Sequence, residues 1–168
     1  MQRAKKILAI TSTNGKLGFA AFEDSLLADY GVKTVYRGGT TDVFSANFDR
    51  IVLRLIADKN PEIVVIEVDA DPRSKKAAGL KALLALTRRM VAKGKIELQE
   101  YSRKQVRKSL SGTENCPRRE VARIVAERYP ELKSCFKRNQ KWGDRYYQHL
   151  FEAVAAGMTY LQYRDGNS

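Results

Sequence analysis

A histidine and a glutamate stand three residues apart in the stretch "WGDRYYQHLFEAVAAG", and they are the first candidates for chemistry. His149 is the only histidine among the 168 residues, and the acid is Glu152. A spacing of three places both side chains on one side of a helix. An imidazole at that place can assist the activation of water or orient a phosphate. The alternative is a pair of polar side chains on a solvated face, which is the common case at this spacing.

The apolar residues of this helix lie nearly opposite the histidine–glutamate pair. At 100° per residue they form one stripe, made of Tyr147, Leu150, Phe151, Val154, Met158 and Leu161. Ala153 and Ala156 share the side of His149 and Glu152. Such small residues would let another backbone or a phosphate chain come close.

A third candidate, Glu67, stands at the end of the run "EIVVIEV". A near-continuous β-branched run is typical of a strand that is buried on both faces. A carboxylate has no place in a core, but at the end of such a strand it can point into a cleft. The alternative is an exposed acid at a strand end. Asp69 and Asp71 follow at alternate positions and share the side of Glu67 if the strand continues.

The charge of the chain favours an anionic partner. Lys and Arg number 31 against 19 acids, giving a formal net charge of +12. Proteins with such an excess most often bind nucleic acid and less often an acidic membrane surface. The alternative is a basic protein whose charge only keeps it soluble. Cys116 and Cys135 match no zinc pattern and no disulfide framework, so we expect a reducing cytoplasm. No apolar run reaches the length of a membrane span, so we expect no membrane partner.

The front of the chain predicts a hairpin and then a crossover. Asn14-Gly15 separates two apolar runs and favours a tight turn between strands at 6–13 and 16–23. A third strand is expected at 32–37. The expected helix that follows has Asp42 as its cap and ends before Pro61.

The rest of the chain alternates strands and helices. The elements expected here are a strand at 62–68, a helix at 74–94 closed by Gly94, a strand at 95–101, and helices at 103–109, 117–128 and 144–163, the last capped by Asp144. A hairpin followed by βαβ crossovers implies a mixed α/β sheet with helices on its faces. We expect a single domain over residues 1–168. Chemistry on such sheets usually lies at strand ends.

Four segments in this order carry a resemblance to a known family. They are "ILAITSTNGKLGFAAFE", "NPEIVVIEV", "YSRKQVRKSLSGTENCPRREVARIV" and "HLFEAVAAG". Together they resemble the RuvC Holliday-junction resolvases of the ribonuclease H-like superfamily. The resemblance implies a mixed five-stranded sheet, led by an antiparallel hairpin and covered by helices on both faces. It also implies a homodimer that works across a DNA junction.

The resemblance implies two-metal hydrolysis of a phosphodiester. Mg²⁺, or Mn²⁺ in its place, prefers carboxylate oxygens that converge from separate elements. Glu67 matches the family's fourth-strand glutamate, and Glu152 matches the last acid of its closing helix, so both are the expected metal ligands and catalytic residues. His149 matches the position three before that acid and is expected to assist.

The first strand departs from the family. Where the family has an aspartate, "ILAIT" places Thr11, and a threonine hydroxyl is uncharged and a poor Mg²⁺ ligand. Its neighbours Ser12, Thr13 and Asn14 offer no carboxylate. Either the metal site is altered, or the fold is kept and the reaction is lost.

The basic segment resembles the part of the family that contacts DNA. Arg107 stands where the family has a DNA-contacting lysine, and Arg118 matches the lysine that opens the next helix. Lys104, Lys108 and Arg119 extend this patch. Arg can clasp a phosphate with two hydrogen bonds, so an exchange of Lys for Arg keeps backbone binding. The alternative is a solvated run of charge.

Two functions from different classes follow. The first is a Mg²⁺-dependent, structure-specific endonuclease acting on branched or structured DNA. The second is a catalytically inactive module of the same fold that binds nucleic acid. A protein-interaction scaffold, whose charge only gives solubility, is a weaker third.

Overall fold

One mixed sheet organises the chain. The computed structural model describes residues 3–13, 15–35, 39–68, 78–142 and 146–166. The strands are β1 (Lys6–Thr13), β2 (Lys16–Glu23), β3 (Leu26–Thr34), β4 (Ile63–Glu67) and β5 (Glu97–Tyr101), in the order β3-β2-β1-β4-β5. The first three pair antiparallel, whereas β1–β4 and β4–β5 are parallel. The predicted hairpin-led, five-stranded sheet is confirmed.

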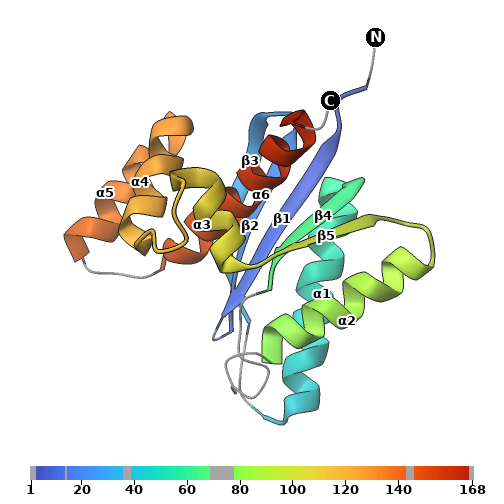
Figure 1. Ribbon diagram of the computed structural model, residues 1–168. Helices are drawn as coiled ribbons and strands as arrows, with labels where there is room; N and C mark the ends of the chain where they lie inside the picture. Colours follow the sequence, from blue (N-terminus) through green and yellow to red (C-terminus); the bar gives the residue numbers. More distant parts are fainter. Residues whose placement is uncertain (1–2, 14, 36–38, 69–77, 143–145, 167–168) are drawn as a thin grey trace.

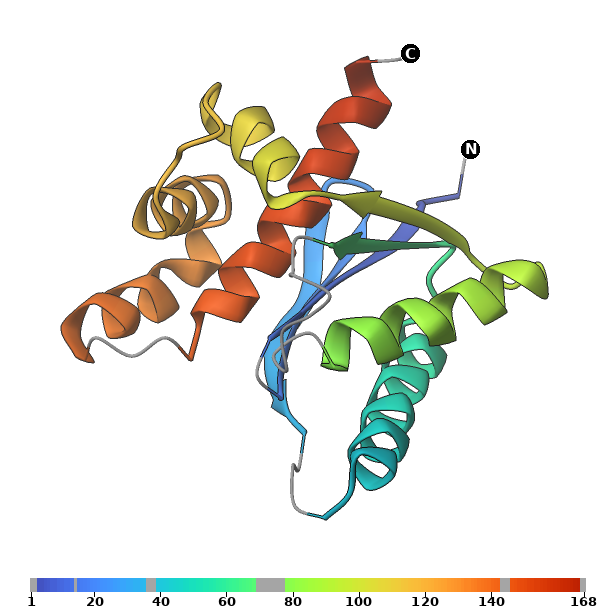
Figure 2. The same cartoon turned by 60° about the horizontal axis from the view of Figure 1, so that its bottom comes forward.

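Helices cover both faces of this sheet (Figures 1 and 2). One face carries α1 (Thr41–Lys59) and α2 (Ala78–Ala92). The other carries α6 (Gln148–Gly166), which is flanked by α3 (Arg103–Ser111) and α4 (Arg118–Arg128). The segment between α4 and α6 contains the short 3-10 helix η2 (Pro130–Leu132) and α5 (Lys133–Trp142). Among the described residues, no helix is long and apolar enough to cross a membrane.

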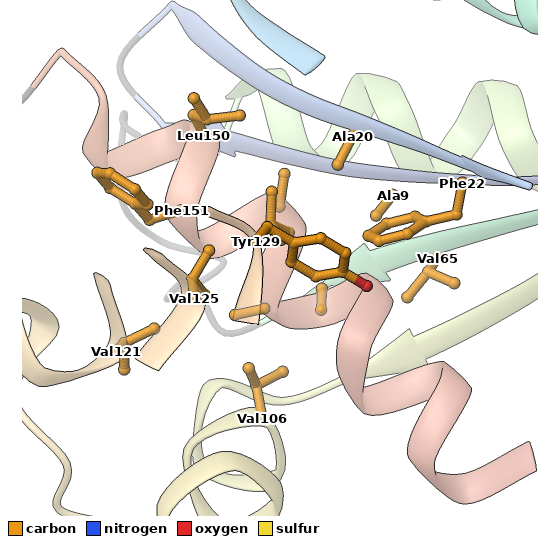
Figure 3. Close-up of a cluster of buried hydrophobic side chains, with 14 of the residues drawn as sticks. Ala9, Ala20, Phe22, Val65, Val106, Val121, Val125, Tyr129, Leu150 and Phe151 are labelled. Carbon is orange, nitrogen blue, oxygen red and sulfur yellow. The ribbon is translucent and has the colours of Figure 1, made fainter. Parts of the chain in front are cut away.

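Strand alternation divides the buried residues into two cores. Leu8 and Ile10 of β1 pack with Phe48 and the other inward side chains of α1 and α2. Ile7 and Ala9 face the opposite way, toward α6, α4 and α3. Figure 3 shows this second core, in which residues from β1, β2 and β4 lie beside the helical residues Val125, Leu150 and Phe151.

Helix α6 is buried on nearly every side through its first three turns. It packs on β2, β1 and β4 and also against α3 and α4. Glu152, Ala153 and Ala156 are therefore buried together with the apolar stripe. The solvated-face alternative for Glu152 is wrong, because the small residues on its side lie against the sheet rather than in water.

Three element predictions need correction. β3 begins at Leu26 instead of residue 32, because Asp24, at a φ of 52°, closes a tight turn directly after β2. This strand is half exposed, so its apolar alternation is weak. Thr40, not Asp42, caps α1, since its Oγ1 accepts a hydrogen bond from the Val43 amide at 3.3 Å.

The third correction is α5, which was not predicted because its sequence is short and strongly basic and contains few apolar residues. Gly94, at a φ of 70°, follows the end of α2 as expected. The predicted cap Asp144 and the acids Asp69 and Asp71 lie outside the described residues, as do residues 74–77 and 36–37 of the predicted elements.

Candidate functional site

Two neighbouring strands place Thr11 and Glu67 side by side. β1 and β4 are parallel, and their last matched pair is Ile10 with Ile66, so the next residues are Thr11 and Glu67. Because Ile10 and Ile66 face α1 and α2, strand alternation turns Thr11 and Glu67 toward α6. Both side chains are buried at the carboxyl end of the sheet.

The first turn of α6 is held against this strand end. The Thr11 hydroxyl donates a hydrogen bond to the His149 carbonyl oxygen at 2.9 Å. Gly18, which pairs with Thr11 across β1 and β2, permits the close approach. A Cβ atom on Gly18 would lie 2.1 Å from the same carbonyl oxygen. This close contact between the start of α6 and the strands determines the position of Glu152, which lies one helical turn after His149.

Glu67 and Glu152, called the acid pair below, lie close enough to interact electrostatically. Burial raises the pKa of Glu67 to about 7, and the negative charge of Glu152 raises it as well. The positive charges of Arg103 and Arg107 act against this rise but do not cancel it. Burial, together with the nearby second carboxylate, therefore disfavours the charged form of Glu67.

His149 adjoins the acid pair but is kept neutral. Burial lowers the pKa of its imidazole, and the charges of Arg118 and Lys16 lower it further, while Glu152 opposes the shift. Its Nδ1 atom is buried and has no hydrogen-bond partner among the described residues. The structure thus brings all three predicted catalytic side chains into one neighbourhood.

Two arginines, called the arginine pair below, sit on the acid pair. Arg103 Nε lies 3.4 Å from Glu67 Oε1, and Arg118 Nε lies 3.8 Å from Glu152 Oε1. The arginine side chains are 30% and 48% exposed, against 6% and 9% for their glutamate partners. The carboxylates therefore lie beneath, and the guanidinium groups form the outer layer.

Local sequence explains why these arginines arrive here. Glu67 pairs with Tyr101 across β4 and β5, and α3 starts two residues later at Arg103. Ser102 and Gln105 form a capping box that fixes this helix start. Arg118 is the first residue of α4, after Pro117. Each arginine thus stands in the first turn of a helix, where the helix dipole adds further positive potential.

The five predicted nucleic-acid-binding residues lie on α3 and α4. Lys104, Lys108, Arg118 and Arg119 are exposed, and Arg107 is half buried. Arg107 and Arg118 act electrostatically on Glu67 and His149, respectively. These two residues, expected as DNA contacts, thus also adjoin the predicted catalytic residues.

Sequence reasoning missed the partners of the acid pair. Arg103 was not among the predicted nucleic-acid-binding residues, although the S-x-x-Q capping pattern places it at a helix start. Gln148, whose Nε2 donates to Glu152 Oε1 at 3.3 Å, was not singled out. Gly18 was also passed over, although a glycine inside a strand often marks a close backbone approach.

The described side chains do not fit the two-ion site that the resemblance implies. Such a site needs several hard oxygen ligands around each ion. Within the described residues, no group of three or more His, Cys, Asp and Glu side chains is placed to hold a metal ion. The Thr11 hydroxyl donates its hydrogen bond to the His149 carbonyl oxygen. A guanidinium group lies beside each carboxylate, in the place where a metal ion would have to bind.

Comparisons with solved structures identify the fold. The Thermus thermophilus RuvC structure matches with a TM-score of 0.72 and 18% identity over 96% of both chains. T. thermophilus RuvC in complex with its Holliday junction substrate matches with a TM-score of 0.71 and 19% identity, again over 96% of both chains. The yeast mitochondrial Holliday junction resolvase matches at 0.67 and 11% identity, over 97% of this chain and 82% of that one. The chain therefore has a RuvC-like fold.

No family model matches the sequence, and no curated protein matches it significantly. At these identities the similarity is one of fold.

Proposed function

We propose that this protein binds branched or structured DNA through the basic residues of α3 and α4. The observation that carries the proposal is the positive outer layer at the strand ends of a RuvC-like fold, where a guanidinium group lies beside each carboxylate of the acid pair. The similarity to a RuvC structure that holds a Holliday junction supports branched DNA as the ligand.

The backbone phosphates are the natural partners of these cations. Lys104, Arg107 and Lys108 project from α3, and Arg118 and Arg119 begin α4. Contacts of this kind release condensed counterions, so affinity falls steeply with salt. The protein would act in the cytoplasm as a single domain, and as a homodimer if it spans a junction, which light scattering at working concentration can measure.

Hydrolysis of a phosphodiester is the second candidate function. It is favoured by one observation, the convergence of Glu67, Glu152 and His149 at a strand end. Mg²⁺ or Mn²⁺ would be the cofactor, held by Glu67 and Glu152. Because the described donors do not fit two ions, the binding function is the better supported of the two.

Fluorescence anisotropy with a four-way junction, a duplex and a single strand of matched sequence tests the binding proposal. We expect junction affinity at least about tenfold above duplex affinity, with log K falling linearly as log salt rises. Equal affinity for junction and duplex, or binding that ignores salt, would contradict it.

The same DNAs, run on denaturing gels after incubation with Mg²⁺ or Mn²⁺, test hydrolysis. We expect no cleavage by the wild-type protein. Cleavage that disappears in Glu67→Gln would establish the endonuclease instead.

A further inference from the structure

We propose that the arginine pair, Arg103 and Arg118, is a phosphate-binding site that holds a DNA backbone phosphate directly and without a divalent ion. In this site Glu67 and Glu152 are positioning residues for the guanidinium groups rather than metal ligands. The inference rests on the proposed function, because the phosphate it assigns is that of the bound DNA.

The layering of the site is the first argument. An incoming group meets Arg103 and Arg118 before it meets the carboxylates, which are almost fully buried. Each carboxylate lies at the Nε atom of its arginine. A guanidinium presents its N–H donors in a planar fork that matches the geometry of a phosphate, which suits both arginines to this ligand.

The charge of the neighbourhood is the second argument. Lys16, Arg103, Arg107 and Arg118 act on a site that holds two carboxylates, and the imidazole is kept neutral. Among the described residues, the formal charge of this neighbourhood is therefore positive. Such a field attracts a phosphodiester anion and repels a divalent cation.

The rigidity of the supporting elements is the third argument. The capping box fixes the start of α3, and the Thr11 hydroxyl fixes the start of α6. Gln148 donates to the same Glu152 oxygen that lies nearest Arg118. A guanidinium held by a buried carboxylate loses less conformational freedom when it binds, which favours affinity.

The test compares junction binding in EDTA and in Mg²⁺ for the wild type and for variants. We expect wild-type affinity in the two buffers to agree within about twofold once ionic strength is matched. Arg103→Gln and Arg118→Gln should each weaken binding in EDTA by about tenfold and reduce the salt slope by about one. Arg54→Gln, the same charge change on exposed α1, is the matched control and should bind like the wild type.

Circular dichroism melts establish that each variant folds, and Arg103→Lys replaces Arg103→Gln if the latter does not. The lysine keeps the charge but lacks the planar fork, so we still expect weaker binding. Loss of wild-type binding in EDTA would overturn the inference. Binding by both arginine variants equal to that of Arg54→Gln would also overturn it.

A second measurement separates this inference from the proposed function. Inorganic phosphate, titrated in EDTA, should raise the melting temperature of the wild type and of Arg54→Gln, but not of the arginine variants. If the wild type binds no junction and this shift persists, the proposed function fails and the phosphate site stands. The opposite outcome is a wild type that binds the junction while phosphate leaves its melting temperature unchanged and the arginine variants bind as tightly as it does. In that case only the inference fails.

Discussion

At the scale of single residues, one hydroxyl decides how the candidate site is built. Thr11 takes the place at the end of β1 where the resemblance implies an aspartate, and it uses its proton to bond the His149 carbonyl. A carboxylate at this place would have no proton to donate. It would also add a negative charge beside two buried carboxylates, so Thr11 fits the metal-free phosphate site proposed above.

Thr11→Asp should therefore destabilise the protein in metal-free buffer by roughly 3 kcal/mol, since it buries an unpaired charge and removes a hydrogen bond. Chemical denaturation in EDTA measures the loss. Mn²⁺ should restore part of it in the variant and leave the wild type unchanged, because among the described residues the variant adds a third carboxylate beside Glu67 and Glu152. Thr11→Ser keeps the hydroxyl and serves as the control. A Thr11→Asp protein as stable as the wild type in EDTA would contradict this account.

The raised pKa of Glu67 makes stability depend on pH. Its folded pKa of about 7 lies above the ordinary value of 4.5. The folded state thus holds a proton that the unfolded state releases. The stability this contributes is fully present below pH 4.5 and is lost as pH rises through 7.

Glutamine cannot ionise, so Glu67→Gln should not lose this stability as pH rises. The difference in free energy of unfolding between the variant and the wild type should shift in favour of the variant by roughly 2 to 3 kcal/mol from pH 4.5 to pH 8. Urea denaturation across that range measures the difference between the two pH profiles. Glu62→Gln, an exposed change just before β4, should show no such divergence. Parallel profiles for Glu67→Gln and the wild type would show that the carboxyl titrates normally.

At the scale of elements, the site depends on how closely α6 lies on the sheet. Gly18 lets the first turn of the helix approach β2, and Gly157 lets a later turn approach Phe22. A Cβ atom on Gly157 would come within 2.2 Å of the Phe22 ring. These two glycines determine how close α6 lies to the strands. They therefore also determine how deeply the Glu152 side chain is buried.

Gly18→Ala should destabilise the fold by about 3 kcal/mol, because its Cβ meets backbone atoms that cannot rotate away. It should also weaken junction binding, since the start of α6 carries Gln148 and Glu152 toward Arg118. Thermal melts and anisotropy measure the two effects. Gly166→Ala, where nothing lies within 4 Å of the new atom, should change neither. A Gly18→Ala protein with wild-type stability would mean that α6 does not lie this close.

At the scale of the whole molecule, both helical layers carry exposed basic side chains, but among the described residues those of the α3 and α4 layer lie beside the acid pair. The layer of α3 and α4 carries the arginine pair and the exposed residues Lys104, Lys108 and Arg119. The layer of α1 and α2 lies on the opposite face of the sheet (Figure 2). DNA should therefore contact the first layer, and charge changes on the two layers should have unequal effects.

The triple variant Lys104→Gln, Lys108→Gln and Arg119→Gln should weaken binding to junction and duplex alike and reduce the salt slope by about three. A matched triple variant on α1 and α2, at Arg54, Arg88 and Arg89, should leave both affinities nearly unchanged. Anisotropy over a salt series measures the slopes. If both triple variants lost the same affinity, net charge alone would explain DNA binding, and the α3 and α4 face would have no special role.

The sequence by itself determined the fold class and part of the site. Strand alternation, the Asn14-Gly15 turn and the β-branched run before Glu67 are local patterns, so they predict the sheet and the strand end that carries the acid. The three-residue spacing likewise predicts that His149 and Glu152 share a helix side. Weak alternation explains why the start of β3 was missed, and low apolar content explains why α5 was missed.

Only the tertiary structure decided which groups meet. Glu67 and Arg103 lie 36 residues apart, and Thr11 and His149 lie 138 apart. Their contacts depend on strand register and on how α3, α4 and α6 pack on the sheet, which no local pattern encodes. Burial of Glu152 likewise follows from packing on both sides of α6. The sequence could name the acids, but it could not show that arginines cover them, because charge pairing is a property of the folded surface.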